Sequence, residues 1–204
     1  MNLLHTCLRL IVAAILTASS GIAYASNLTV QVNASNRAPL EDVVVYLISN
    51  KTTAISVPGP RPEIQQINKA FVPLVSVVQT GSLVDFPNKD KFRHHVYSFS
   101  EAKKFEIKLY ADTPSKPILF DKPGYVVMGC NIHDNMISHL LIIDTPYFAK
   151  SDARGRAMIS NVPNGDYSLI AWYYQRPDKN ALTLPVSVKT DATQMLVIDA
   201  SPGI

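Results

Sequence analysis

The sequence predicts an all-β protein built around a central β-sandwich or barrel, with further strands before and after it. Short runs rich in β-branched and aromatic residues alternate with turn residues, and no stretch keeps a helical period. Eight such runs fall in the middle of the chain, and we expect them to pair as an antiparallel sandwich or barrel. They are residues 64–71, 75–79, 83–86, 94–99, 105–110, 118–120, 125–130 and 140–143.

Further runs flank this central series. Residues 28–32 alternate apolar and polar side chains, and residues 43–48 are rich in valine, so we expect these two runs to form a hairpin. Residues 49–62 contain three prolines and a glycine without periodicity, which indicates a linker. The runs after Pro146 are residues 157–159, 167–174, 182–188 and 195–198.

The first 25 residues have the composition of a signal peptide. Arg9 supplies a short positive region, residues 10–16 an apolar region, and Ala23 and Ala25 the small residues of a cleavage point before Ser26. We therefore expect an exported protein. No apolar run reaches the length of about 18 residues that a membrane-spanning helix needs. The predicted division is a signal peptide at 1–25, N-terminal strands and linker at 26–62, a central domain at 63–145 and a C-terminal sandwich segment at 146–204.

The charge balance argues against a nucleic-acid partner. Hydrophobic residues make up 47% of the chain, charged residues 17%, and the formal net charge is +3. Proteins that bind nucleic acid concentrate positive charge on one face or in one segment. This sequence has no comparable cluster of positively charged residues, and we expect no nucleic-acid partner.

Cysteine usage narrows the chemistry. Cys7 leaves with the signal peptide, so Cys130 is the only cysteine of the mature chain. A single thiol in an oxidising compartment cannot form an internal disulfide. A free buried thiol, a crosslink to another chain and a metal ligand are the three alternatives.

The residues that follow Cys130 favour a metal ligand. Cys130, His133 and Met136 stand at intervals of three, at what reads as the end of a strand running into a loop. Thiolate, imidazole and thioether are the soft donors that suit copper in both of its common oxidation states. Zinc is the alternative for cysteine and histidine, but structural zinc sites usually take two or more cysteines, and methionine is a poor zinc ligand. We therefore expect copper as the cofactor.

A second imidazole is available from residues 93–97, which read RHHVY. His94 and His95 would point to opposite faces of a strand, so both cannot readily bind the same ion. Both faces carry apolar residues, and alternation alone leaves the choice open. The four histidines of the mature chain all lie within residues 94–139, which supports a shared site. His139 is expected to be a surface or structural histidine.

These segments resemble the type 1 copper proteins, or cupredoxins, of the amicyanin and plastocyanin kind. Residues 129–136, GCNIHDNM, resemble their ligand loop. Residues 81–88, GSLVDFPN, followed by residues 94–96, resemble the segment that carries their first histidine. The resemblance covers about residues 63–145 and implies a Greek-key β-sandwich that binds copper. The ligands that it implies are His94, Cys130, His133 and Met136.

Three residues beside these ligands are candidates for tuning the site: His95, Asn131 and Asp134. Well-known cupredoxins have asparagine after the first histidine, where it ties the two ligand segments together, whereas this chain has His95. Amicyanin-type loops have proline where this chain has Asp134. Hydrogen bonds around a metal tune its properties, so these departures are expected to affect the redox potential and the docking surface.

The flanks resemble the transthyretin-like sandwich of carboxypeptidase regulatory domains. The similar segments are residues 38–40 (APL), 152–155 (DARG) and 162–169 (VPNGDYSL). The cupredoxin unit would then be inserted between two halves of a second sandwich; the alternative is one enlarged sandwich. The whole chain is similar to exported bacterial proteins commonly labelled methylamine utilization proteins, a label from which we infer no methylamine oxidation.

The leading functional hypothesis is a periplasmic one-electron carrier that exchanges electrons with a redox partner protein. No enzyme activity is expected, because no general base, nucleophile or open coordination position is evident. A second hypothesis is a copper protein that stores, delivers or senses the ion. The third is a binding module, in which the flanking sandwich recognises a protein or glycan through an aromatic platform. That platform would comprise Tyr167, Trp172, Tyr173 and Tyr174.

Overall fold

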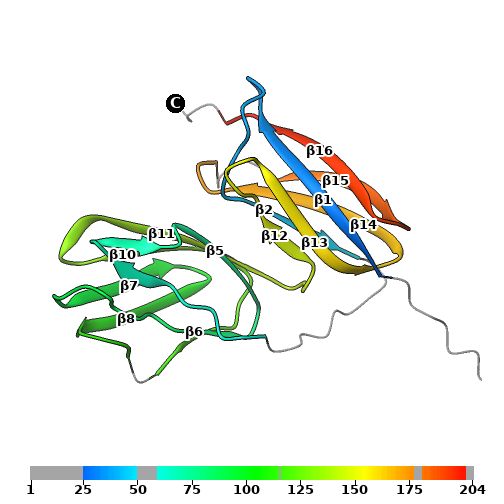
Figure 1. The fold of residues 1–204 in the computed structure, drawn as a ribbon. Coiled ribbons are helices and arrows are strands. Elements are labelled where there is room, and N and C mark those ends of the chain that lie inside the picture. Colours follow the sequence, from blue (N-terminus) through cyan, green and yellow to red (C-terminus); the bar gives the residue numbers. More distant parts are fainter. Residues whose placement is uncertain (1–24, 50–58, 115, 177–180, 201–204) are drawn as a thin grey trace, which may run out of the picture.

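The computed structural model describes residues 25–49, 59–114, 116–176 and 181–200, and the regular elements in these ranges are β-strands (Figure 1). The predicted all-β fold class is confirmed. The strands form two units, each with its own hydrophobic core. No helix in this part of the chain has the length and apolar character needed to cross a membrane. Residues 1–24 of the predicted signal peptide and most of the predicted linker lie outside the described residues, and Ala25 begins β1.

The first unit is a β-sandwich formed by strands from the N-terminal and C-terminal parts of the described chain. Its strands are β1 (Ala25–Ala34), β2 (Val43–Ile48), β12 (Phe148–Lys150), β13 (Arg156–Pro163), β14 (Gly165–Tyr173), β15 (Leu182–Val188) and β16 (Ala192–Ile198). One sheet has the order β13-β1-β16, and the other the order β12-β2-β14-β15. Alternate residues of β1, among them Leu28, Val30 and Val32, are buried in the core between the sheets, because alternate side chains of a strand share a face.

The predicted hairpin of β1 and β2 is wrong. β1 pairs with β13 and, in parallel, with β16, whereas β2 pairs with β12 and β14. The two strands belong to different sheets and contribute to the same core from opposite sides. Alternation identifies the face that a strand buries, but it does not identify the neighbouring strand. The sequence pattern therefore could not show whether the two strands are hydrogen-bonded neighbours in one sheet or lie in opposite sheets of the sandwich.

The second unit contains the central series of runs. Its strands are β3 (Gln65–Ile67), β4 (Ala70–Val72), β5 (Val75–Gln79), β6 (Ser82–Val84), β7 (His94–Ser100), β8 (Lys103–Tyr110), β9 (Ile118–Phe120), β10 (Gly124–Cys130) and β11 (His133–Ile143). A five-stranded sheet has the order β5-β11-β10-β7-β8, and the pairs β3-β4 and β6-β9 complete the unit.

Two details of this unit differ from the prediction. The run at 64–71 is two short strands, because Asn68 and Lys69 both have a positive φ, 53° and 60°. Successive residues with positive φ are typical of a tight hairpin turn. The other difference is that β5 pairs with β11 in parallel. The five-stranded sheet is therefore mixed rather than antiparallel throughout.

The inner face of the five-stranded sheet buries a core that includes two of the predicted ligands. Val126, Met128 and Cys130 are buried from β10, and Met136 and Leu140 from β11. Interiors of this kind are close-packed, so side chains in them have little freedom to move. Cys130 and Met136 are thus positioned by core packing.

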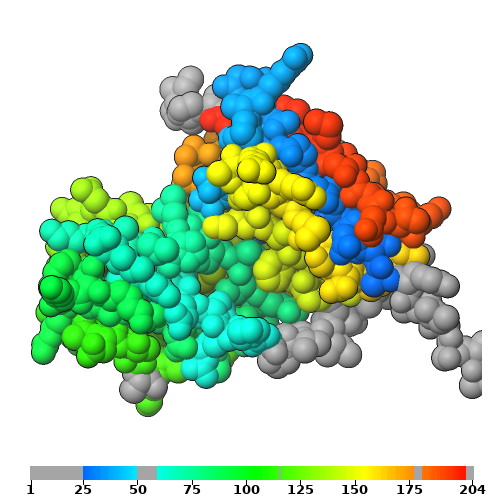
Figure 2. Space-filling model, in the orientation of Figure 1, coloured from blue at the N-terminus to red at the C-terminus, as the bar shows by residue number. Residues whose placement is uncertain are grey.

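The two units meet through a third hydrophobic cluster. Its buried residues are Val44 and Trp172 of the sandwich and Val75, Leu141 and Ile143 of the five-stranded sheet. The ammonium of Lys150 donates a hydrogen bond to the carbonyl of Val75 at 2.9 Å, so the sandwich also satisfies a backbone group of the edge strand β5. Figure 2 shows the two units packed against each other.

His139 of β11 lies beside this interface and has a structural role. The hydroxyl of Tyr125 and His139 Nδ1 form a hydrogen bond of 2.5 Å, and the Tyr125 ring also contacts Trp172, with ring centres 5.1 Å apart. The Tyr174 ring centre lies 4.7 Å from that of His139. Burial raises the pKa of Tyr125 to about 12 and lowers the pKa of His139. Both shifts favour the neutral forms that make this hydrogen bond.

The predicted aromatic platform is wrong. Tyr167, Trp172 and Tyr173 are only 8%, 6% and 9% exposed. Tyr167 and Tyr173 belong to the core of the sandwich, and Trp172 belongs to the interface cluster. These aromatic side chains stabilise the protein and are not available to a ligand.

Acidification is expected to weaken the interface between the units. Because burial lowers the pKa of His139 in the folded protein, the stability contributed by its neutral form is present above about pH 6.5, the ordinary histidine value, and is lost as the pH falls through the folded pKa. Urea denaturation followed by the fluorescence of Trp172, the only tryptophan, should show a lower free energy of unfolding at pH 5 than at pH 7.5. The variant His139→Gln should lose part of this difference; an unchanged difference would contradict the assignment.

Candidate metal centre

Cys130 and His133 face each other across a tight turn. β10 ends at Cys130, Asn131 and Ile132 form the turn, and β11 begins at His133. Cys130 is opposite His133 in the antiparallel pair, after a shift of register between Gly129 and Cys130. The predicted loop is therefore a hairpin turn, and the spacing of three residues places the two donors side by side.

The structure brings a thiol and two imidazoles together. Cys130 Sγ lies 3.6 Å from His94 Nδ1 and 3.9 Å from His133 Nδ1. One ligand atom from each of these three residues lies within 4.8 Å of the other two. His94 is fully buried, Cys130 is 4% exposed, and His133 is half-buried. The cluster therefore has a buried side and a side that faces the surface.

Burial decides between the two adjacent histidines. His94 shares the inner face of β7 with buried Val96, whereas His95 lies on the opposite face. The ring of His95 meets Glu106 of β8, with Nε2 and Oε1 2.8 Å apart. His94 is thus the histidine that joins the cluster, and His95 interacts with an acid on the outer face.

Met136 lies in the same core cluster as Cys130. It is almost fully buried on β11, on the face that also carries Ser138 and Leu140. Its thioether therefore belongs to the inner layer that contains the thiol. In copper sites that combine one thiolate with two imidazoles, a methionine thioether acts as the weak axial donor.

Asp90 completes the surroundings of His94, and sequence reasoning missed it. Asp90 Oδ2 lies 2.8 Å from His94 Nε2. The same carboxylate accepts hydrogen bonds from the backbone N–H groups of Asn68, at 2.7 Å, and Lys69, at 3.0 Å. The turn between β3 and β4 thus positions the Asp90 carboxylate, and that carboxylate in turn positions the His94 ring. The available signal was an acid four residues before a histidine, which by itself is weak.

This contact sets the chemistry of the imidazole. When Nε2 donates its proton to Asp90, Nδ1 keeps its lone pair, and Nδ1 is the atom that faces Cys130. Burial alone would raise the pKa of Asp90, but the hydrogen bonds from Lys69, His94 and Asn68 outweigh it and hold the pKa below its usual value. The acid is therefore a charged acceptor for His94.

The other two predicted tuning residues differ in their roles. The backbone N–H of Asn131 donates to the carbonyl of His95 at 3.0 Å. This bond ties the segment after Cys130 to the segment after His94, so the two ligand segments are joined through backbone atoms. Asp134 is exposed, and its carboxylate makes no hydrogen bond or ion pair within the part of the chain that the structure describes.

These donors fit a copper ion. One thiolate, two imidazole nitrogens and a buried thioether match the mixed set that copper accepts in both common oxidation states. The cluster contains one cysteine, and no carboxylate joins it among the described residues. Structural and catalytic zinc sites usually need those additional ligands. The donor set therefore favours copper over zinc.

Comparison with known proteins gives a likeness of shape only. No family model matches the chain, and no curated protein matches it. Among solved structures, the Cu-containing nitrite reductase of Thermus scotoductus SA-01 is 24% identical with a TM-score of 0.39, over 45% of this chain and 24% of its own. A purple cupredoxin of Nitrosopumilus maritimus is 16% identical with a TM-score of 0.36, over 40% of this chain and 98% of its own.

A mutant of amicyanin with Cu(I) is 14% identical with a TM-score of 0.37, over 48% of this chain and 97% of its own. The likeness spans under half of this chain, and the chain spans about a quarter of the nitrite reductase. At these values the comparisons carry no argument about what this chain binds. The assignment of copper rests on the donor geometry.

Replacing Asp90 tests its structural role without any metal. The variant Asp90→Asn loses the charge of an acceptor with three hydrogen-bond partners, and the free energy of unfolding should fall by roughly 1–3 kcal/mol. Urea denaturation of the metal-free protein measures it. The matched control Asp134→Asn changes an exposed carboxylate and should stay within about 0.5 kcal/mol of the original protein. Equal changes in both variants would show that Asp90 has no special role.

Proposed function

We propose that this protein is a type 1 copper protein that carries single electrons and is exported to the periplasm by its N-terminal residues. One observation carries the proposal: the buried thiol of Cys130 lies between two imidazole nitrogens at the surface end of a packed β-sandwich. Bound there, copper would supply one-electron chemistry by alternating between Cu(I) and Cu(II). The residues would act as holders of the ion, and we propose no enzymatic reaction.

The buried ligands are fixed by the fold. Cys130 and Met136 are packed into the core, and His94 is held by Asp90 from the side away from the thiol. A site held by packing and by surrounding hydrogen bonds keeps its geometry when the charge of the ion changes. Such rigidity favours rapid electron exchange, because little has to move.

His133 has a different task. It is only half-buried and begins β11 at the surface, whereas His94 is enclosed. Among the three clustered donors it therefore offers the shortest way from the site to a partner. The N–H of Asn131 bonded to His95 keeps this turn close to β7. His133 would thus be both a ligand and the point of electron entry and exit.

Copper loading tests the ligand set. Metal-free protein titrated with Cu(II) should develop the intense visible absorption of a copper–thiolate bond. The variant Cys130→Ser should lose that absorption, because serine removes the thiolate, while His139→Gln should keep it, because His139 lies in the domain interface. A colourless complex of the original protein, or a Cys130→Ser variant that keeps the band, would contradict the assignment.

Voltammetry separates a carrier from a protein that stores or delivers copper. A carrier should give a reversible one-electron wave with the ion retained in both oxidation states. The variant Met136→Leu should shift that potential upward, since the axial donor stabilises the oxidised ion. Tight binding of Cu(I) alone, with loss of the ion on oxidation, would favour storage or delivery instead.

A further inference from the structure

The surface beside the metal centre has an apolar middle. Phe92 is 40% exposed and Ile132 is 46% exposed. The ring centre of Phe92 lies 5.1 Å from that of His94 and 5.4 Å from that of His133. The Phe92 ring thus contacts both imidazoles and is itself partly exposed. A molecule that docks on Phe92 would therefore be separated from the two imidazoles only by the Phe92 ring.

Exposed cations lie next to Phe92 in the chain, and one more contacts its ring. The exposed cations are Lys69, Lys89, Lys91 and Arg93. None of them forms an ion pair with any residue that the structure describes. Elsewhere in the same unit, Lys103 pairs with Asp121 and Lys122 pairs with Glu101. The metal end therefore carries four exposed cations that form no ion pair with the described residues.

Hydrogen bonds hold these cations in place. The N–H of Lys89 donates to the carbonyl of Gln66 at 2.9 Å, and the amide of Asn88 donates to the carbonyl of Phe92 at 2.8 Å. The ammonium of Lys69 lies 5.7 Å from the centre of the Phe92 ring, in a cation–π contact. Segment 88–93 and the β3-β4 turn thus form one surface, which we call the cationic rim.

The acids near the cationic rim do not cancel it. The side chain of Asp90 is only 8% exposed and is turned toward His94 and the backbone of the turn. Asp112 adjoins Asn88 through its backbone carbonyl, and Asp134 is exposed beside His133. Four exposed cations therefore face solvent with two exposed acids at the periphery.

We propose that the cationic rim and Phe92 form the docking surface for an acidic redox partner, a protein whose own apolar patch is bordered by aspartate and glutamate. This inference rests on the proposed carrier function and names the chemistry of its partner. Opposite charges steer the encounter of two proteins and fix their orientation. Apolar contact at Phe92 and Ile132 would then exclude water between the two redox centres.

Two small redox ions test the surface in the copper-loaded protein. Hexacyanoferrate(III) is an anion and tris(phenanthroline)cobalt(III) is a cation; each accepts one electron from the Cu(I) protein, which becomes Cu(II). In stopped-flow measurements, added salt should slow the reaction with the anion. The double variant Lys91→Glu/Arg93→Glu should slow that reaction by about threefold or more and speed the reaction with the cation.

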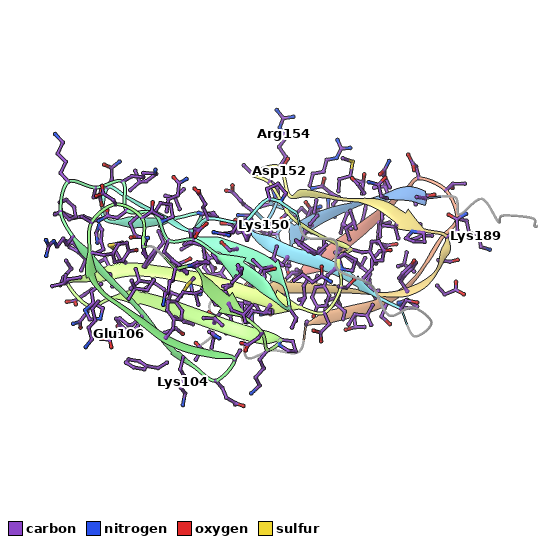
Figure 3. The ribbon with its side chains drawn as sticks, turned by 90° about the horizontal axis from the view of Figure 1, so that it is seen from below. Lys104, Glu106, Lys150, Asp152, Arg154 and Lys189 are labelled. Atoms are coloured by element: carbon purple, nitrogen blue, oxygen red, sulfur yellow. The ribbon has the colours of Figure 1, made fainter. Side chains whose placement is uncertain are left out.

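A matched control separates local charge from net charge. Arg154 and Lys189 are exposed on the sandwich unit (Figure 3). The double variant Arg154→Glu/Lys189→Glu changes the net charge by the same amount and should leave both rates within about twofold of the original. Equal effects of the two double variants, or none, would overturn the docking surface and leave the carrier function standing. No exchange with either ion would overturn the carrier function and the inference with it.

A second measurement needs no copper. In nuclear magnetic resonance of the metal-free protein, an oligoglutamate peptide should shift the backbone amides of residues 69, 89–93 and 132–133. The amides of residues 152–156, which lie on the sandwich unit, should not move. Shifts that are absent at the cationic rim, or equal in both regions, would overturn the proposed surface.

Discussion

The metal centre depends on the contact between the carboxylate of Asp90 and the imidazole of His94. His94 is fully buried, and a buried ring nitrogen without a partner would cost about 1–3 kcal/mol. Asp90 supplies that partner at Nε2 and so leaves Nδ1 facing Cys130. Because the backbone of Asn68 and Lys69 holds Asp90, a turn far from the ligands in sequence orients one of them.

The same strand serves the metal centre and the interface between the units. β11 begins with His133 at the surface end of the site, buries Met136 in the core, and ends with Leu141 and Ile143 against the sandwich. Its inner face therefore positions ligands, and its outer face binds the second unit. His139 lies between these regions, on the outer face, where it forms a hydrogen bond with the hydroxyl of Tyr125 rather than joining the ligands.

Sequence reasoning could predict the features that depend on local spacing. Cys130 and His133 are three residues apart, so one tight turn brings them together. Strand alternation left the choice between His94 and His95 open, because both faces of β7 carry apolar residues; the family resemblance implied His94, and the buried cluster contains it. Asp90 could not be identified, because its role arises from contact with a turn more than twenty residues earlier in the chain. The pairing of β1 likewise depended on β13 and β16 from the other end of the chain.

The contact between Asp90 and His94 also affects which charges of the neighbouring loop are exposed. Asp90 is the only acid in residues 88–93, which otherwise carry Lys89, Lys91 and Arg93. In an exposed loop, a carboxylate among three cationic side chains would offset part of their positive electrostatic potential. Here the carboxylate is turned inward and is occupied by a ligand histidine and two backbone donors. The interaction that orients the buried histidine therefore also keeps the loop's only carboxylate largely out of contact with solvent, while Lys89, Lys91 and Arg93 stay exposed. One residue thus contributes to the geometry of the centre and to the pattern of charges on the surface beside it.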